Sequence, residues 1–185
     1  MPATKDEIAS AFMELALRHT YRRTAVEDVA RALRISKKTI YDFFSSKEDL
    51  LRYALELSAT QQRCRVESML TATTALGRLE QAVAIALADA RRSFESNPSD
   101  RLEEPPELTA QVNARVFGPM VRDLVSAGVA AGEFQVPDVD LAAAFGMAVG
   151  TEAVRIILED PTSHPEAAAL DAIRRLVAGK VEVQE

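Results

Sequence analysis

The chain has 185 residues, enough for one domain or two small ones, and its 48% hydrophobic residues suffice for a sizeable core. A single cysteine, Cys64, excludes an internal disulfide framework, and seven glycines with eight prolines are too few for an all-β chain rich in tight turns. The net charge of −6 alone argues against nucleic-acid binding, and no apolar run approaches the roughly 20 residues of a membrane span. We therefore expect an all-α, soluble, cytoplasmic protein.

The charge is unevenly distributed along the chain. Residues 18–47 contain eight Lys and Arg against three acids, a net charge of +5. Residues 53–185 contain 12 Lys and Arg against 20 acids, a net charge of −8. A basic segment attached to an acidic body indicates that only the N-terminal part meets a polyanion.

The first predicted helix runs from about Thr4 to His19. Ile8, Phe12 and Ala16 recur at four-residue spacing and form one apolar stripe. Thr4 is suited to cap the start of this helix, because its hydroxyl accepts a hydrogen bond from a backbone N–H of the first turn.

Two short helices follow within the basic segment. The pattern T-x-x-E of residues 24–27 is a capping box, and apolar positions carry that helix to about Leu33. Ser36 caps the next helix, in which Ile40 and Phe44 recur at i, i+4 and should face the core. The same register leaves four side chains largely outward: Lys37, Lys38, Thr39 and Tyr41.

Two short helices joined by a tight turn, the second opening with basic and hydroxyl residues, predict a helix-turn-helix. The second helix of this motif lies in the DNA major groove, where Lys meets guanine O6/N7 or a phosphate and hydroxyl groups bond phosphate oxygens. A long helix then follows a cap at Ser45 or Ser46 and extends to about Met69.

The rest of the chain is predicted to be helical with one clear loop. Helices are expected at residues 76–94, from about 107 onward, at 140–158 with Asp138 or Asp140 near its start, and at 165–177. The proline-rich residues 96–107 mark the loop, and Pro119 either kinks a helix or opens a new one. We count nine or ten helices and no convincing strand.

The stretch "TAVEDVARALRISKKTIYDFFSSKEDLL", residues 24–51, resembles the N-terminal domain of the tetracycline-repressor (TetR) family of bacterial transcriptional regulators. The resemblance covers roughly residues 5–55, and "GVAAGEFQVPDVDLAAA" looks like the segment before that family's dimerisation helices. It implies an all-α fold with a three-helix helix-turn-helix DNA-binding domain in residues 1–46. Residues 47–185 would form a larger helical effector-binding and dimerisation domain.

The resemblance also implies which residues meet DNA. Lys37, Lys38 and Thr39 would read the major groove, and Tyr41 would contact the DNA backbone or a thymine methyl group. Lys47, near the start of a long helix, would bind a phosphate. The alternatives are a solvated helix start for the two lysines and packing between helices for Tyr41.

Three further positions bear on the same motif. By the resemblance, Thr24 would cap the second helix and also approach a phosphate; the alternative is capping alone. Arg34 stands where the family often has Gly, because the turn between the two helices favours a positive φ; an Arg there costs on the order of 1 kcal/mol or adds a phosphate contact. Thr20 likewise replaces a frequent Gly, and Phe43 replaces a frequent His or Tyr.

Small residues suggest a dimer interface in the C-terminal part. Ala142, Gly146 and Gly150 repeat at i, i+4, i+8, and with Ile173 and Leu176 of the last helix they suit a four-helix intersubunit bundle. The alternative is an ordinary buried Ala-rich helix. A two-fold dimer would set two recognition helices about 34–36 Å apart, so the operator should be palindromic.

Large soft or aromatic residues are the candidates for an effector cavity among the central helices. They are Met69, Phe94, Phe117, Met120 and Phe145. Plain core packing is the alternative for each of them.

The sequence thus predicts a repressor that a small, mostly apolar effector releases from a palindromic operator. The alternatives are an all-helical small-molecule-binding protein or enzyme with an incidental helix-turn-helix, and an effector-free architectural DNA-binding dimer. His19 and His164 are far apart in the sequence, and no catalytic, metal-ligand or phosphate-loop pattern stands out. We therefore expect no enzyme, no metal and no cofactor.

Overall fold

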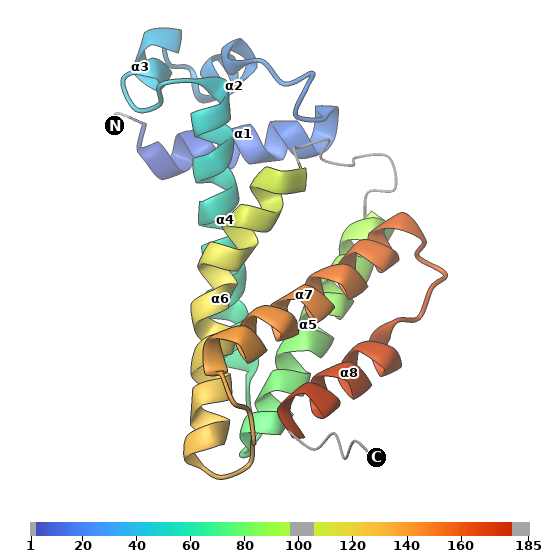
Figure 1. Cartoon of the computed structure of the whole chain (residues 1–185). Helices are drawn as coiled ribbons and strands as arrows, with labels where there is room; N and C mark the ends of the chain where they lie inside the picture. The colour runs from blue at the N-terminus through green and yellow to red at the C-terminus, as the bar shows by residue number, and fades with distance from the viewer. Residues whose placement is uncertain (1–2, 97–105, 179–185) are drawn as a thin grey trace. The chain divides into compact units, whose positions relative to one another are not determined.

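A computed structural model describes residues 3–96 and 106–178, apart from the side chains of residues 93–96 and 106. Within these ranges all regular structure is helical, which confirms the all-α prediction (Figure 1). The helices are α1 (Lys5–His19), α2 (Val26–Leu33), α3 (Lys37–Tyr41), α4 (Lys47–Met69), α5 (Ala75–Ser96), α6 (Pro106–Ala130), α7 (Val139–Glu159) and α8 (Glu166–Ala178).

The described part of the chain thus has eight helices, fewer than the nine or ten that the sequence predicts. The difference includes Pro119, which lies inside α6 and does not open a new helix. A proline within a helix removes one backbone hydrogen bond, and the turns on both sides of it continue in this 25-residue helix.

The described residues form two compact units. The first unit contains residues 3–62 and 106–116, and the second contains residues 63–96 and 117–178. Helices α4 and α6 each contribute to both units. The predicted domain boundary between residues 46 and 47 stays a prediction, but Leu50 and Leu51 at the start of α4 are fully buried in the first unit.

Local hydrogen bonds start the helices of the first unit. The Thr4 hydroxyl accepts a 3.2 Å bond from Glu7 N, and the Glu7 carboxylate accepts a 2.7 Å bond from Thr4 N, so the cap predicted for α1 is confirmed. Ser36 Oγ accepts a 3.0 Å bond from Thr39 N and caps α3, also as predicted. Ser46 plays the corresponding part for α4, since its Oγ accepts a 3.0 Å bond from Asp49 N.

The predicted capping box of α2 is wrong by one residue. The N-cap is Ala25, whose N–H donates a 3.1 Å bond to the Asp28 carboxylate. Thr24 is instead buried, with 2% of its surface exposed, and its hydroxyl donates a 2.9 Å bond to the Thr20 carbonyl. The side chain is therefore used inside the fold and not at the helix start.

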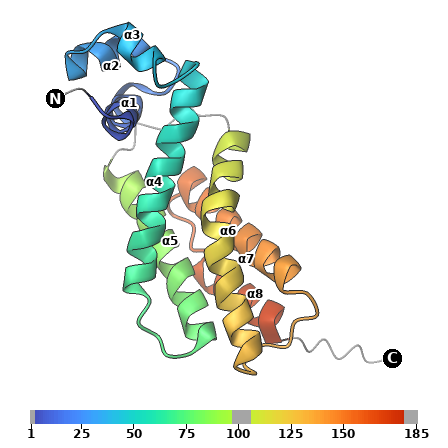
Figure 2. The same ribbon diagram turned by 90° about the vertical axis from the view of Figure 1, so that its left-hand side faces the viewer.

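In the second unit, α5, α7 and α8 pack against one another (Figures 1 and 2). A hydrophobic core joins them to the second half of α6 through Leu79, Leu124, Val125, Phe134, Ile173 and Val177. The Glu133 carboxylate accepts bonds of 3.1 and 3.2 Å from the first two N–H groups of α5, those of Ala75 and Leu76. Asp138 caps α7 through a 2.9 Å bond from Leu141 N, which confirms Asp138 as the cap.

Helix α7 is unusually apolar. By length and composition alone it is long enough and apolar enough to cross a membrane, although the core helix of a soluble protein passes the same test. Ala142, Ala143 and Ile157 are buried within the second unit, whereas Leu141 and Phe145 are about half exposed. Only part of the apolar surface of α7 is therefore covered within its own unit.

Candidate nucleic-acid interface

Helix α3 presents polar side chains to solvent because one apolar residue within it and another just after it anchor it to the core. Ile40 and Phe44 are each only 1% exposed. Lys37, Lys38 and Tyr41 are exposed, and Thr39 is partly buried. The register that the i, i+4 spacing of Ile40 and Phe44 predicts is confirmed, so packing among the helices does not account for Tyr41.

The two adjacent lysines have different surroundings. Lys37 Nζ forms an ion pair with the Glu27 carboxylate of α2 and lies 5.8 Å from the centroid of the Tyr41 ring. The hydrogen bond between them raises the pKa of Lys37 and lowers the pKa of Glu27. In the part of the chain that the structure describes, Lys38 forms no ion pair within 4.0 Å.

The turns on both sides of α2 are strained. Arg34 has φ 54° and ψ 40°, the left-handed conformation that the sequence analysis expects in the turn between α2 and α3. Thr20 has φ 67° and ψ 153°, a combination that is otherwise almost restricted to glycine. Both side chains therefore occupy positions where a glycine would be less strained.

Lys47 is partly buried and already has partners. Its ammonium group donates a 2.6 Å bond to the Tyr21 carbonyl and lies 4.3 Å from the centroid of the Tyr21 ring. Burial lowers the pKa of Lys47. The side chain thus ties the start of α4 to the loop after α1, and a phosphate would have to compete for these hydrogen bonds.

The first unit also contains an open hollow whose lining includes two arginines. The sequence analysis did not name these arginines as site residues. The hollow is lined by Leu15, His19, Arg23, Asp28, Arg31 and Ala32. Arg23 and Arg31 are exposed, although Arg31 forms a 3.2 Å ion pair with Asp28. The +5 charge of residues 18–47 was the sequence signal that included these two arginines.

The candidate effector residues do not gather in one place. Phe117 packs against a small core cluster that contains Met120, together with Val66 and Ala82. Met69 and Phe145 are 47% and 52% exposed. The side chain of Phe94 lies outside the described residues.

The candidate dimer residues mostly face their own subunit. Ala142 and Ile173 are buried in the core of the second unit. A Cβ on Gly146 would lie 3.8 Å from Val121 Cγ1 and 3.9 Å from Leu176 Cδ2, whereas one on Gly150 would meet nothing within 4 Å. Ordinary core packing therefore describes Ala142 and Ile173, and the interface itself stays a prediction.

The described ranges contain no group of three His, Cys, Asp or Glu side chains placed to hold a metal ion. The first unit instead combines a short helix held by two apolar anchors, a tight left-handed turn before it and exposed basic and aromatic side chains along it. This is the arrangement of a helix-turn-helix, in which the outward face of the second helix enters a DNA groove.

Residues 8–54, within the first unit, match the family described as "Bacterial regulatory proteins, tetR family". Residues 8–54 therefore form a DNA-binding domain of the TetR type. The protein is a DNA-binding transcriptional regulator, as its sequence predicts. No curated protein sequence matches the chain.

Solved structures show the same fold over nearly the whole chain. RolR in complex with resorcinol has a TM-score of 0.72 at 20% identity, covering 95% of this chain and 87% of RolR. FadR from Bacillus subtilis in complex with stearoyl-CoA has a TM-score of 0.67 at 20% identity, covering 95% and 98% of the two chains. The reduced form of NemR from E. coli has a TM-score of 0.69 at 15% identity, again covering 95% and 98%. The second unit thus has a known architecture.

Proposed function

We propose that this regulator is a cytoplasmic homodimeric repressor that binds a palindromic operator and is released from it by a small, mostly apolar effector. The observation that carries the DNA-binding part is the outward face of α3. Lys37, Lys38 and Tyr41 are exposed there while Ile40 and Phe44 hold the helix to the core. We propose no catalytic activity and no cofactor.

Within this proposal the DNA contacts are not all of one kind. Lys38 is the lysine best placed to meet a guanine edge or a phosphate, and Thr39 and Tyr41 supply hydroxyl groups beside it. Arg34 directs an exposed guanidinium from the turn before α3, where it adds a phosphate contact. Two other residues act mainly through the fold: Thr24 by its buried hydroxyl and Lys47 by its bonds to the loop after α1.

Dimerisation is supported by the exposed apolar surface of α7. Leu141 and Phe145 lie one turn apart on α7 and are 49% and 52% exposed. Apolar side chains that remain uncovered in a monomer are a common sign of a protein–protein interface. We therefore place the interface on the side of α7 that carries Leu141 and Phe145, together with α8.

The effector is proposed to bind among α4, α5 and α6, beside the cluster of Phe117 and Met120. RolR and FadR, which share the fold, have structures with resorcinol and with stearoyl-CoA, and both ligands carry apolar surface. These neighbours support an organic effector without identifying it for this chain.

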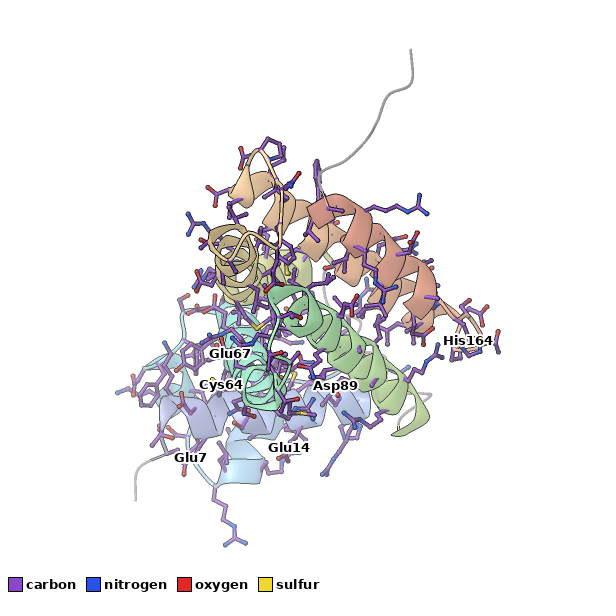
Figure 3. The ribbon with its side chains drawn as sticks, turned by 90° about the horizontal axis from the view of Figure 1, so that it is seen from below. Glu7, Glu14, Cys64, Glu67, Asp89 and His164 are labelled. Atoms are coloured by element: carbon purple, nitrogen blue, oxygen red, sulfur yellow. The ribbon has the colours of Figure 1, made fainter. Side chains whose placement is uncertain are left out.

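The connection to DNA is proposed to run along α4, which belongs to both units. In the second unit, the buried Asp89 of α5 (labelled in Figure 3) pairs with Arg65 of α4 and with Arg92. An effector that moves α4 relative to α5 would change the position of α3 in each subunit. DNA affinity would fall only as far as the effector prefers the non-binding state.

The decisive experiment measures DNA binding by fluorescence anisotropy, using a duplex that the wild-type protein selects from a randomised library. Lys38→Ala should weaken binding to this duplex at least tenfold, whereas Arg122→Ala on α6 of the second unit should leave it unchanged. Equal affinities of wild type and Lys38→Ala would contradict the placement of α3 in the groove. Release of the duplex by added hydrophobic organic compounds would then test the effector part separately.

A further inference from the structure

Glu27 is an exposed acidic residue in the predominantly basic helix-turn-helix, where its carboxylate lies beside the start of α3. It lies in the first turn of α2, and its carboxylate pairs with Lys37 Nζ at the start of α3. The two side chains are 53% and 49% exposed, so the pair forms at the surface and not in the core. Helices α2 and α3 pack against each other, which keeps the two residues within reach.

The ion pair fixes Lys37 between two partners. Its ammonium group meets the Glu27 carboxylate on one helix and lies 5.8 Å from the ring of Tyr41, four residues along its own helix. The hydrogen bond from Lys37, and after it one from the backbone N–H of Glu27, favour the ionised form of Glu27 and lower its pKa. At neutral pH the motif therefore carries a negative charge beside its recognition helix.

We propose that Glu27 is a specificity-determining residue, which holds Lys37 on the recognition helix and reduces the attraction of that helix to non-operator DNA. The proposal rests on the proposed placement of α3 in the major groove.

The physical reason lies in how the two kinds of DNA binding arise. Binding to arbitrary sequence depends almost entirely on Lys and Arg replacing counterions at phosphates. A lysine that is already neutralised by Glu27 adds little to this attraction, and the carboxylate repels phosphates. At the operator, a base edge at the right position offers Lys37 a directed partner, so the ion pair is exchanged for a specific contact.

The test compares two duplexes of equal length: one selected from a randomised library by the wild-type protein, and one with the same bases in scrambled order. Affinities are measured between 50 and 200 mM salt, taken as roughly the range over which phosphate contacts change affinity most visibly. Glu27→Gln keeps the shape of the side chain and removes its charge. Thermal unfolding followed by circular dichroism verifies that each variant is folded.

We expect Glu27→Gln to bind the scrambled duplex more tightly and with a steeper salt dependence. One additional effective phosphate contact steepens the slope of log K against log[salt] by about 0.9, which adds about a 3.5-fold change in affinity between 50 and 200 mM salt. The ratio of selected to scrambled affinity should fall. Glu14→Gln, the same charge change at an exposed position of α1 (labelled in Figure 3), should leave the ratio unchanged.

A double-variant comparison shows whether Glu27 acts through Lys37. In a Lys37→Ala background, Glu27→Gln should lower the ratio of selected to scrambled affinity by less than it does in the wild-type chain, because only the repulsion between the carboxylate and phosphates is then removed. An unchanged ratio and slope in Glu27→Gln would overturn the proposal, and so would an equal effect of Glu14→Gln. If Lys38→Ala weakens binding while Glu27→Gln changes nothing, only the role of Glu27 is refuted. If Lys38→Ala also changes nothing, the placement of α3 itself is refuted.

Discussion

The hydroxyl of Thr24 donates a 2.9 Å hydrogen bond to the carbonyl oxygen of Thr20, and Thr24 N donates a second, 3.1 Å bond to the same atom. Thr20 is the residue whose backbone has φ 67° and ψ 153°. The two bonds hold this strained residue in the turn that leads into α2. The only acceptor of the Thr24 hydroxyl in this arrangement is inside the fold, so its main effect should be on stability.

Thr24→Val should therefore lower the free energy of unfolding by about 1 kcal/mol, the typical contribution of one hydrogen bond. Urea unfolding followed by circular dichroism measures the change. Thr60→Val, at an exposed position of α4 in the same unit, is the matched control and should change stability by less than about 0.5 kcal/mol. If Thr24→Val has normal stability but no longer binds DNA, the result would instead support the phosphate contact that the sequence predicts for Thr24.

Arg34 should show opposite effects on stability and on DNA binding. Arg34→Gly removes the strain of a left-handed non-glycine residue and should raise the free energy of unfolding by about 1 kcal/mol. It also removes the guanidinium and should weaken DNA binding. Arg34→Ala is the control, because it loses the guanidinium but keeps the strain. If both variants bind DNA as the wild type does, Arg34 makes no contact with phosphate.

Gly128 leaves room for a buried aromatic ring. A Cβ at this position of α6 would lie only 2.2 Å from Phe134 Cδ2, and Phe134 is 4% exposed in the core of the second unit. Gly128→Ala should cost about 1–3 kcal/mol of stability, as overpacking of a core does. Chemical unfolding measures this loss, and Phe134→Leu in the same chain should recover part of it.

Gly150 provides the matched comparison for Gly128. A Cβ there meets nothing within 4 Å, so Gly150→Ala should stabilise the isolated subunit by up to about 1 kcal/mol through helix propensity. Similar losses of stability in both alanine variants would show that the contact with Phe134 does not decide the effect at Gly128.

The proposed dimer predicts a specific effect of charge on α7. Phe145→Glu places a carboxylate on the exposed apolar side of the helix and should convert the dimer into monomers without unfolding the subunit, because this side chain is half exposed. Sedimentation velocity reads the oligomeric state and circular dichroism the helix content. Ala178→Glu, at an exposed end of α8, serves as a control for added charge. A dimer that persists in Phe145→Glu would place the interface elsewhere.

Local interactions made several features predictable from the sequence. The caps at Thr4, Ser36 and Asp138 are hydrogen bonds between residues three apart in the chain. The outward position of Lys38 follows from the spacing of Ile40 and Phe44. In each case the partners lie within one or two helical turns, so the sequence contains both sides of the interaction.

Small-residue spacing was less informative. The stripe that begins with Ala142 and Gly146 predicts that something approaches α7 closely, but the helix pattern does not say which neighbour. The structure places Val121 and Leu176 of the same subunit near the Gly146 position. Met69 and Phe145, which the sequence assigned to the effector cavity, are instead 47% and 52% exposed.

The amino-acid sequence alone determined the helical class and the outward face of the recognition helix, because helical periodicity acts over a few residues. The positive φ at Arg34 was expected from the resemblance to the TetR family, in which a Gly is frequent at this position. Only the tertiary structure decided that Lys47 is bonded to Tyr21, 26 residues away, and that Lys37 is paired with Glu27, ten residues away. Such partners meet only after the helices pack. The three lysines therefore differ: Lys47 connects α4 to the loop after α1, and Lys37 is paired with Glu27. Lys38 forms no ion pair in the described part of the chain.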